Sequence, residues 1–455
     1  MICGDSTMFD ARSNSLRTAI ATQRQITGAA HGHVLTNVNV WSPDGKWIVY
    51  DVRSDPAGSS FDGRRIEIVH TQTGEVRLIH ESKRGANCGV ATFSPIENKI
   101  AFIHGPEQPT HDWSYSAWHR DGVIIDLAGA GTPVQLDGRD ITPPFTPGAL
   151  RGGSHVHIFS GDGRWFSFTY EDHVLATLDR DAFADADLNQ RTIGVSAPAR
   201  SIHVPRNHPR NHDGSHFTVL VTRTHNAPRA GSDEIQRACE EGWVGGAGYL
   251  RADGVRQRRA LAFQGQVISE EGKPVSEVFI VDIPDDITQP GQGPLQGTPT
   301  TRPLPPRGCV QRRLTRTTHR LFPGIQGPRH WLRSSPDGAR IAFLMKDDAG
   351  IVQLFTVSPQ GGTITQVTHN DRSIASAFTW SPDGASIACI IDRSVCIIDA
   401  HTGQTTRLTQ ATDEAASPRP EACVYSPDGR QIAFVRTVDA QGMRCNQIFT
   451  VDVPL

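Results

Sequence analysis

Short segments in which apolar and polar residues alternate recur along the chain, and each follows a similar turn. Four turns read SPDG and three are degenerate copies; they begin at Ser42, Ser94, Ser160, Asn211, Ser335, Ser381 and Ser426. Asp-Gly between two apolar runs indicates a hairpin, because Gly tolerates the positive φ that a tight turn requires. The period of two predicts strands with one buried face.

A third and a fourth apolar run follow in most of these repeats, as in RIEIVH and EVRLIH after the first turn. Four antiparallel strands in a repeat of roughly 40–60 residues are typical of a propeller blade. The last repeat lacks its fourth strand, and TQRQITGAAHG (22–32) has the pattern of the other outer strands. We therefore predict an all-β, seven-bladed β-propeller over residues 1–455, whose last blade is closed by the N-terminal strand.

The fourth and fifth repeats interrupt this pattern, and we predict a long insertion at residues 226–305. Within it, GSDEIQRACEEGW suggests a short helix with Ser232 as its N-cap. The Pro- and Gly-rich segment 288–308 follows. It is expected to form a surface loop or, alternatively, a lid beside an active site.

Composition and charge exclude a few classes of protein. No apolar run is long enough for a membrane span, and the start, MICGDSTMFDARSNSL, lacks the regions of a signal peptide. The eight cysteines are scattered, without a C-x-x-C pair or a zinc-ligand spacing. The formal net charge of −3 says little about partners. We expect a monomer without a nucleic-acid or membrane partner.

The segments that would enter the central channel, between one blade and the next, are rich in Arg and His. The candidates are His33, Arg84, Arg151, His155, His157, Arg206, His208, Arg210, Arg329, His330, Arg372 and Arg419. If they converge on one mouth, they form a cavity suited to an anion. Arg binds a carboxylate through two parallel hydrogen bonds, which suits a uronic acid. Each of these residues could instead bridge neighbouring blades.

The residue types in these segments favour one reaction class over others. A glycosidase needs two carboxylates across the scissile bond, and these segments are poor in Asp and Glu. The chain has no G-x-S-x-G, P-loop or Rossmann motif. β-Elimination of a uronate needs a group that neutralises the carboxylate, a base and an acid, and Arg, His and Tyr supply all three.

Individual roles follow from position. His155 and His157, two residues apart on a predicted strand, are expected to share a face. The candidate bases are His104 and the His155/His157 pair, and the candidate acids are Tyr170 and His330. The candidate substrate-binding residues are Arg84, Arg151, Arg223, Arg329, Gln326 and Trp331.

Several long segments resemble a known family. FIHGPE, PGALRGGSHVHIFS, SFTYEDHVL, GSDEIQRACEEGWVG and IAFLMKDDAGIVQLFTVSPQGG resemble TolB-type seven-bladed propeller proteins, many of them uncharacterised and bacterial. The family is similar to the propeller lyases that cleave the L-rhamnose-α-1,4-D-glucuronate linkage of gum arabic.

The resemblance implies a polysaccharide lyase with its site at the channel mouth, an unsaturated glucuronate product and release of rhamnose. It further implies a calcium ion in the channel and an extracellular location, with the cytoplasm as the alternative. Gln326 and His330 in GIQGPRHW loosely resemble the metal-binding His and Gln cluster of propeller oligogalacturonate lyases. Two alternatives stay open: a metal-dependent oligogalacturonate-type lyase, and a non-catalytic TolB-type interaction module.

Overall fold

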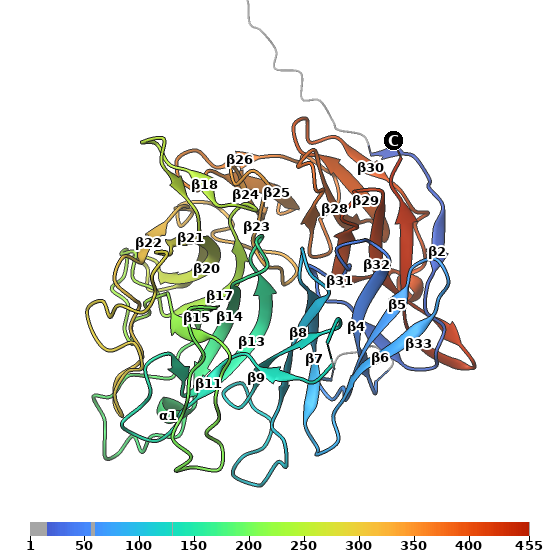
Figure 1. The fold of residues 1–455 in the computed structure, drawn as a ribbon. Helices are drawn as coiled ribbons and strands as arrows, with labels where there is room; N and C mark the ends of the chain where they lie inside the picture. The colour runs from blue at the N-terminus through green and yellow to red at the C-terminus, as the bar shows by residue number, and fades with distance from the viewer. Residues whose placement is uncertain (1–15, 56–59, 130, 455) are drawn as a thin grey trace, which may run out of the picture.

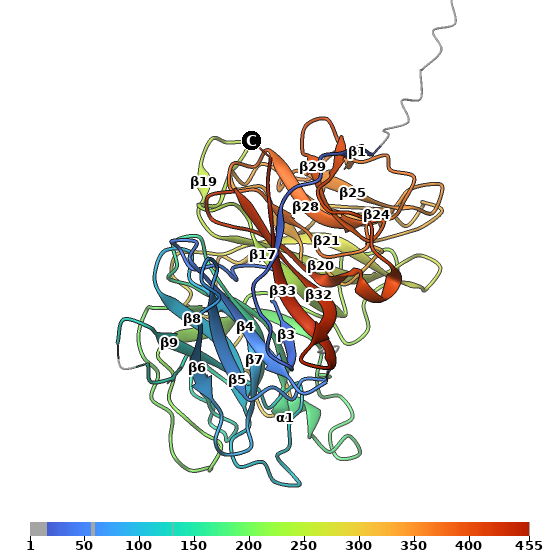
Figure 2. The ribbon, with the colours of Figure 1, turned by 90° about the vertical axis from the view of Figure 1, so that its right-hand side faces the viewer.

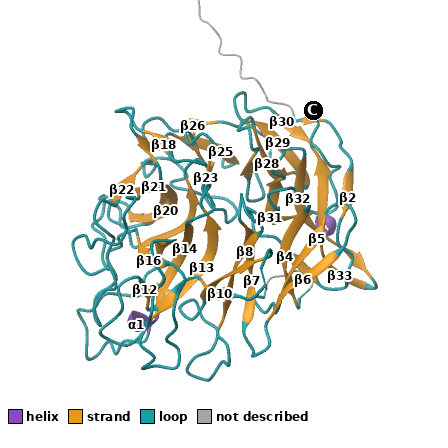
Figure 3. Cartoon of the chain, viewed as in Figure 1, coloured by secondary structure: helices purple, strands orange, loops and turns teal. Residues whose placement is uncertain are grey.

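Seven sheets of four or five strands each are arranged in a ring, as predicted (Figure 1). The computed structural model describes residues 16–55, 60–129 and 131–454; the predicted absence of a signal peptide concerns residues that lie almost entirely outside these ranges. The chain runs once around the ring, so that the red last blade lies beside the blue first blade. Nearly all regular structure is strand (Figure 3).

The first three blades are formed by residues 32–220. The first blade contains β3 (Gly32–Val34), β4 (Trp47–Arg53), β5 (Arg65–His70) and β6 (Val76–Glu81). The second contains β7 (Asn87–Phe93), β8 (Lys99–Gly105), β9 (Asp121–Asp126) and β10 (Val134–Gln135). The third contains β13 (Gly152–Phe159), β14 (Phe166–Asp172), β15 (Thr192–Ala197) and β16 (Phe217–Leu220).

The other four blades follow the same order. The fourth contains β17 (Arg237–Trp243), β20 (Ala260–Ile268), β21 (Pro274–Asp282) and β22 (Val310–Arg313). The fifth contains β23 (Arg333–Ser334), β24 (Ile341–Lys346), β25 (Val352–Val357) and β26 (Thr365–Gln366). The sixth contains β27 (Thr379–Trp380), β28 (Ser386–Ile391), β29 (Ser394–Asp399) and β30 (Thr405–Arg407). The seventh contains β31 (Pro418–Tyr425), β32 (Gln431–Ala440), β33 (Met443–Asp452) and β2 (Gln23–Gln25).

Short elements decorate the ring. The strand β1 (Arg17–Thr18) adds to β30 in parallel. Two small pairs are β11 (Gly138–Arg139) with β12 (Ala149–Leu150) and β18 (Tyr249–Leu250) with β19 (Arg256–Gln257). The helix α1 (His173–Ala176) and a 3-10 turn, Glu414–Ala416, are the helical segments of the described chain. None of its helices is long and apolar enough to cross a membrane.

The SPDG turns owe their recurrence to local chemistry. The Ser42 hydroxyl donates to Asp44 Oδ1 at 2.6 Å and accepts the N–H of Trp47 at 3.0 Å, while Gly45 adopts a φ of 68°. The same two hydrogen bonds recur at Ser160, Ser335, Ser381 and Ser426. The turn therefore starts the second strand of five of the blades at a fixed register.

The N-terminal strand closes the ring, as predicted. β2 pairs antiparallel with β33, and the Ile26 N–H donates to the Ile448 carbonyl at 2.8 Å. In Figure 2 the next strand, β3, lies beside β33, so the first and last blades are in contact. Apolar clusters fill the spaces between neighbouring blades, such as Ala260, Ala262 and Phe343 between the fourth and fifth.

The interpretation of the fourth repeat was wrong. The turn at Asn211 lies inside the third blade, between β15 and β16, where Ile202 and Gly214 form an isolated bridge. The inner strand of the fourth blade is β17, in the segment expected to be a helix. The Ser232 hydroxyl accepts the N–H of Glu234 at 3.2 Å, as a cap would, but the chain then pairs with β20.

The expected insertion at 226–305 consequently contains β17, β20 and β21, three strands of a blade. The Pro- and Gly-rich segment 288–308 lies outside these strands and packs against the third blade. There the Asp187 N–H donates to the Thr300 carbonyl at 2.9 Å.

Candidate active site in the central channel

Three neighbouring inner strands, β7, β13 and β17, are irregular at the same depth. In each, the pairing register shifts beside a non-glycine residue of positive φ: Val90 (56°), Val156 (60°) and Glu240 (56°). An extra residue in one strand bends it and re-aims its side chains. Such bulges, and such φ values, concentrate at binding and catalytic sites.

The bulge at Val156 separates the two histidines that were expected to share a face. His155 is half-buried and lies near Arg120, Arg191 and Arg329. His157 is fully buried, with Nε2 3.4 Å from Asp137 Oδ2 and its ring against Phe168. Because Val156 takes up the extra residue, the alternation of an ideal strand does not hold here.

His155 is held in its neutral form. Burial lowers its pKa well below the usual value, and the positive charges of Arg120, Arg329 and Arg191 lower it further. Its Nδ1 is buried and has no hydrogen-bond partner among the described residues. A neutral imidazole beside several arginines is suited to accept a proton while the arginines hold an anion.

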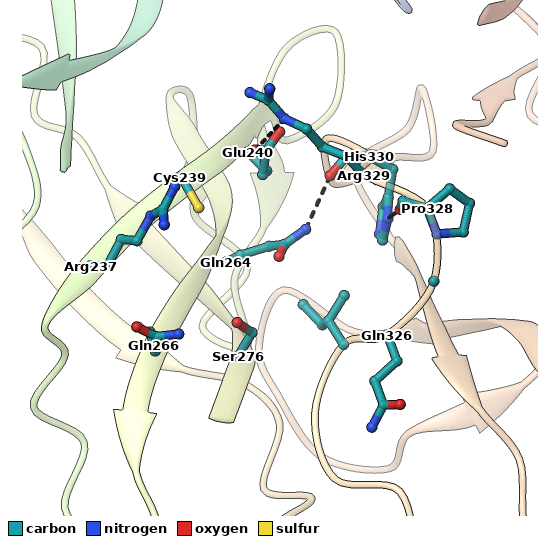
Figure 4. Close-up of a pocket in the computed structure, with 12 residues that line it drawn as sticks. Arg237, Cys239, Glu240, Gln264, Gln266, Ser276, Gln326, Pro328, Arg329 and His330 are labelled. Atoms are coloured by element: carbon teal, nitrogen blue, oxygen red, sulfur yellow. Dashed lines mark hydrogen bonds and ion pairs between the residues drawn. The ribbon is translucent and has the colours of Figure 1, made fainter. Parts of the chain in front are cut away.

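The three arginines are only partly neutralised by the protein. Arg191 pairs with Glu171 at 2.6 Å, and Arg329 donates through Nε to Glu240 at 2.8 Å. The two Nη atoms of Arg329 make no hydrogen bond within the described chain, and Figure 4 shows them directed away from Glu240. Arg120 donates through Nε to the Ala117 carbonyl at 3.2 Å. The group therefore retains positive charge for a ligand.

Glu241, beside Glu240, is fully buried, and neither carboxylate oxygen has a hydrogen-bond partner in the part of the chain that is described. Burial raises its pKa to about 8. The nearby guanidinium of Arg333, whose pKa burial lowers to about 10, bonds Asn37 Oδ1. At neutral pH Glu241 is therefore an uncharged acid in the wall of the channel.

A cavity of about 230 Å³ opens next to Arg329, between the fourth and fifth blades (Figure 4). Its lining side chains come from β17, β20 and β21 on one side and from the segment before β23 on the other. They include Arg237, Cys239, Glu240, Gln264, Gln266, Ser276, Gln326, Arg329 and His330. Figure 4 shows Gln264 reaching across to the His330 carbonyl, a 3.0 Å hydrogen bond that ties the two blades together.

Of the predicted site residues, His155 and Arg329 come together, and Gln326 and Trp331 lie close by. Gln326 lines the cavity, and the Trp331 ring lies 5.0 Å from the Arg329 guanidinium. His155 therefore stays a candidate base, and the other three residues stay candidates for substrate binding.

The two predicted acids are core residues in this fold. Tyr170 is fully buried in an apolar cluster with Leu150, Phe168 and Leu220, and burial raises its pKa well above the usual value. His330 has both ring nitrogens occupied: Nδ1 lies 2.9 Å from the Pro328 carbonyl, and Nε2 accepts the Leu344 N–H at 3.3 Å. His330 therefore has no ring nitrogen left for a substrate, whereas the Tyr170 hydroxyl is buried and has no hydrogen-bond partner among the described residues.

Arg151, predicted as a carboxylate clamp, is a structural bridge instead. It is fully buried and donates to Asp172 at 2.8 and 2.9 Å, and to the carbonyls of Thr298 and Thr301 in the Pro- and Gly-rich segment. All of its guanidinium nitrogens are engaged within the protein.

The other predicted positions lie apart from His155. His104, on the second strand of its blade, contacts His80. Arg84 is exposed and 3.6 Å from Glu107, and Arg223 bonds Gln292 at 2.5 Å at the edge of the fourth blade.

The segment 203–212 belongs to the β15–β16 connection rather than to a passage between two blades, because the turn at Asn211 was misassigned. Arg210 there donates to the carbonyls of Glu107 and Gln108. His208 lies 6.4 Å from the ring of Trp113.

Two further candidates already have partners within the protein. His33 is buried with Nδ1 2.9 Å from the Asn446 carbonyl, and Arg419 pairs with Glu421 at 2.8 Å.

Comparison with known proteins identifies the family. The chain is 48% identical over 416 residues to the uncharacterized protein YidR of Escherichia coli (strain K12), which covers 90% of this chain and 94% of that protein. The chain belongs to the YidR family. A family model described as a protein of unknown function, DUF3748, matches residues 87–212, which include Arg120, His155 and Arg191 of the channel site.

Solved structures are similar to this YidR-family chain in fold. An oligogalacturonate lyase in complex with manganese is 10% identical with a TM-score of 0.54, covering 96% of this chain and 98% of that one. An oligogalacturonate lyase from Vibrio parahaemolyticus is 11% identical with the same TM-score, covering 96% of each chain. A putative TolB from Agrobacterium tumefaciens is 16% identical with a TM-score of 0.40, covering 86% and 98%. At these identities the likeness to the two oligogalacturonate lyases concerns the fold alone.

The side chains of the channel do not fit the calcium ion or other divalent cation suggested by the resemblance. No group of three or more His, Cys, Asp or Glu residues in the described chain is placed to hold a metal ion. Both ring nitrogens of His330 are hydrogen-bonded to backbone groups. The charged groups around His155 belong mainly to arginines. A cation needs several oxygen or unprotonated nitrogen donors at one point, and the unpartnered His155 Nδ1 and Glu241 oxygens do not form part of such a set in the described chain.

Sequence reasoning missed Arg120, Arg191, Glu240 and Glu241. Arg120 directly precedes β9, and Arg191 directly precedes β15. Both lie within a blade, so a search of the segments that connect one blade to the next does not find them. Glu240 and Glu241 belong to CEEGW, which was read as a helix. The adjacent carboxylates were the available signal, because two carboxylates are unusual on the inner strand of a propeller.

Proposed function

We propose that the protein is a lyase that cleaves a uronate-containing oligosaccharide by β-elimination in the central channel. The observation that carries this proposal is the half-buried, neutral His155 next to Arg120, Arg191 and Arg329. A base and a surplus of positive charge at one point are what removal of a proton next to a carboxylate requires.

In the proposed reaction, the arginines bind the uronate carboxylate and stabilise the negative charge that develops on it. His155 takes the proton from C5, the C4–O bond breaks, and a C4=C5 double bond forms. Tyr115 is our candidate for the proton donor to the leaving oxygen, because it is half-buried and interacts with Arg120. Burial raises the pKa of Tyr115, so its phenol is protonated at neutral pH.

The comparisons support a lyase at the level of the fold. Two proteins of similar fold are named as oligogalacturonate lyases, so a propeller of this shape can carry a lyase site. The finer proposal for the substrate is a glucuronate linked to rhamnose, as in gum arabic-type arabinogalactan, and it rests on the sequence resemblance. An extracellular site of action belongs to that same proposal.

The test is a screen for the conjugated unsaturated uronate, which absorbs in the ultraviolet, with gum arabic, oligogalacturonate and other uronate glycans as substrates. We expect the rate with one of them to fall about 10²–10⁴-fold in His155→Gln, the usual contribution of a general base. Arg223→Gln, which removes a distant arginine, should retain the rate. If folded protein yields no unsaturated product from any uronate glycan, the lyase proposal fails and a non-catalytic propeller module takes its place.

A further inference from the structure

The cavity between the fourth and fifth blades has an ordered polar wall. Arg237 pairs in register with Gln266 on the next strand, and Gln266 pairs with Ser276 on the strand after that. Residues directly opposite on adjacent strands project to the same face of a sheet. Arg237, Gln266 and Ser276 therefore form one row across the blade, with Cys239 and Gln264 in a second row beside it.

This wall is polar where the rest of the same face is apolar. On β20 the positions two apart are Ala260 and Ala262, which belong to the core between the blades, and then Gln264 and Gln266. On β21 the same face carries Ile280 and Val278 and ends at Ser276. The blades thus pack tightly at one end and leave a polar cavity at the other.

Several polar atoms of the wall make no hydrogen bond within the described chain. Gln266 accepts from Gln236 through Oε1 at 2.7 Å, which leaves its Nε2 as a donor. Gln264 and Gln326 donate through Nε2 to backbone carbonyls, at 3.0 and 2.8 Å, which leaves each Oε1 as an acceptor. Donors and acceptors side by side match the hydroxyl groups of a sugar, each of which can donate and accept.

Arg237 gives the cavity its charge. Its guanidinium is exposed and forms no ion pair in the part of the chain that the structure describes, whereas the other arginine of the cavity, Arg329, is paired with Glu240. An arginine without a carboxylate partner, at the rim of a cavity lined by amides, suits a carboxylate or a sulfate group of a ligand.

We propose that this cavity is a subsite for a second anionic sugar, a pyranose that carries a carboxylate or a sulfate ester, next to the uronate that is cleaved. The inference rests on the proposed function, because Arg329 and Glu240 line this cavity and Arg329 also acts on His155. At about 230 Å³ the cavity is smaller than the roughly 300–1,000 Å³ of pockets for drug-sized ligands, which suits a single sugar ring.

The test measures binding without turnover, by calorimetry on the full-length His155→Gln variant. The probes are four saturated disaccharides: galacturonate–galacturonate, galacturonate–rhamnose, glucuronate–N-acetylgalactosamine 6-sulfate and the unsulfated form of the last. We expect Arg237→Gln, added to this variant, to weaken binding of the di-uronate, the sulfated disaccharide or both about tenfold, the effect of one lost charged hydrogen bond. Binding of the two disaccharides with a neutral second sugar should change less than about twofold.

Two control variants test whether the charge and the place of Arg237 matter. Arg237→Lys should retain part of the affinity, and Arg223→Gln should retain all of it. Equal affinity for all four probes with and without Arg237, or no binding of any, would overturn the subsite. If binding depends on Arg237 while the parent protein cleaves none of the probes or polymers, the subsite holds and the lyase proposal fails. If the parent protein cleaves a uronate glycan but binding of the probes does not depend on Arg237, the lyase proposal holds and the subsite fails.

Discussion

Gly122 shows how closely two blades approach one another in this ring. A Cβ atom at this position would lie 2.3 Å from His157 Nε2, and His157 is fully buried against Asp137 and Phe168. We therefore expect Gly122→Ala to lower the free energy of unfolding by about 1–3 kcal/mol, the usual cost of overpacking. Chemical denaturation measures the change. Gly28→Ala, where an added Cβ meets nothing within 4 Å, is the matched control, and an equal effect of both would contradict this account.

The pKa of His155 should set the acid limit of activity. As a base, His155 acts only when it is neutral, so kcat/KM falls as the pH drops through its pKa. That pKa is lowered by burial and by the three arginines, so the acid limb should lie below pH 6.5, the usual value for histidine. Arg329→Gln removes one of the positive charges and should move the limb to higher pH. An NMR titration measures the pKa of His155 without a substrate. An unchanged or lowered pKa of His155 in Arg329→Gln would show that Arg329 does not act on this side chain.

Residues whose neighbours lie within a few positions were predictable from the sequence, and those whose neighbours come from other blades were not. The Ser42–Asp44–Trp47 turn is complete within six residues, so its repeats could be counted. The surroundings of His155 come from four segments, and their arrangement depends on a bulge at Val156 that no composition rule signals. Arg151 had a suitable residue type and an apt position, but Asp172 and the distant Thr298 already satisfy it.

At the scale of single elements, β2 carries the closure of the ring. Ile26 directly follows this strand, donates its N–H to the Ile448 carbonyl at 2.8 Å and buries its side chain between the last and first blades. Ile26→Ala should lower the free energy of unfolding by about 2–4 kcal/mol, because the buried side chain is lost. Ile26→Pro should lower it by about 1–3 kcal/mol more than Ile26→Ala does, because the Ile448 carbonyl also loses its hydrogen-bond donor. Equal midpoints of denaturation for the two variants would show that this hydrogen bond does not hold the closure.

The fourth blade shows why elements are harder to predict than turns. Its first strand, β17, contains RACEEGW, whose glutamates favour a helix in isolation. Pairing with β20 and packing against the neighbouring blades override that preference, and the bulge after Cys239 accommodates Glu240 at a φ of 56°. This blade also lacks the Ser-Asp-Gly turn, and β18 and β19 form a hairpin in its place. The repeat count reached seven only because the turn at Asn211 was counted in its stead.

At the scale of the whole molecule, buried histidines should make the protein sensitive to acid. Burial is the first cause of a lowered pKa at His33, His80, His216 and His330, each to about 4, and at His173, to about 3. In the unfolded chain these side chains bind a proton near pH 6.5. Between pH 6.5 and about 4 the unfolded state therefore holds more protons than the folded state, and stability falls as the pH falls.

Each such histidine adds up to about 1.4 kcal/mol per pH unit to the slope of stability against pH. The lowered pKa values of Asp121 and Asp137 act in the same direction at still lower pH. His173→Asn should reduce the slope between pH 4 and 6 by up to one proton, because an asparagine does not titrate. Unfolding by urea at a series of pH values measures the slope for the parent protein and for the variant. A protein whose stability is flat from pH 6.5 to 4 would show that these rings are hydrated in solution and free to protonate, which is incompatible with the closely packed blades that bury them here.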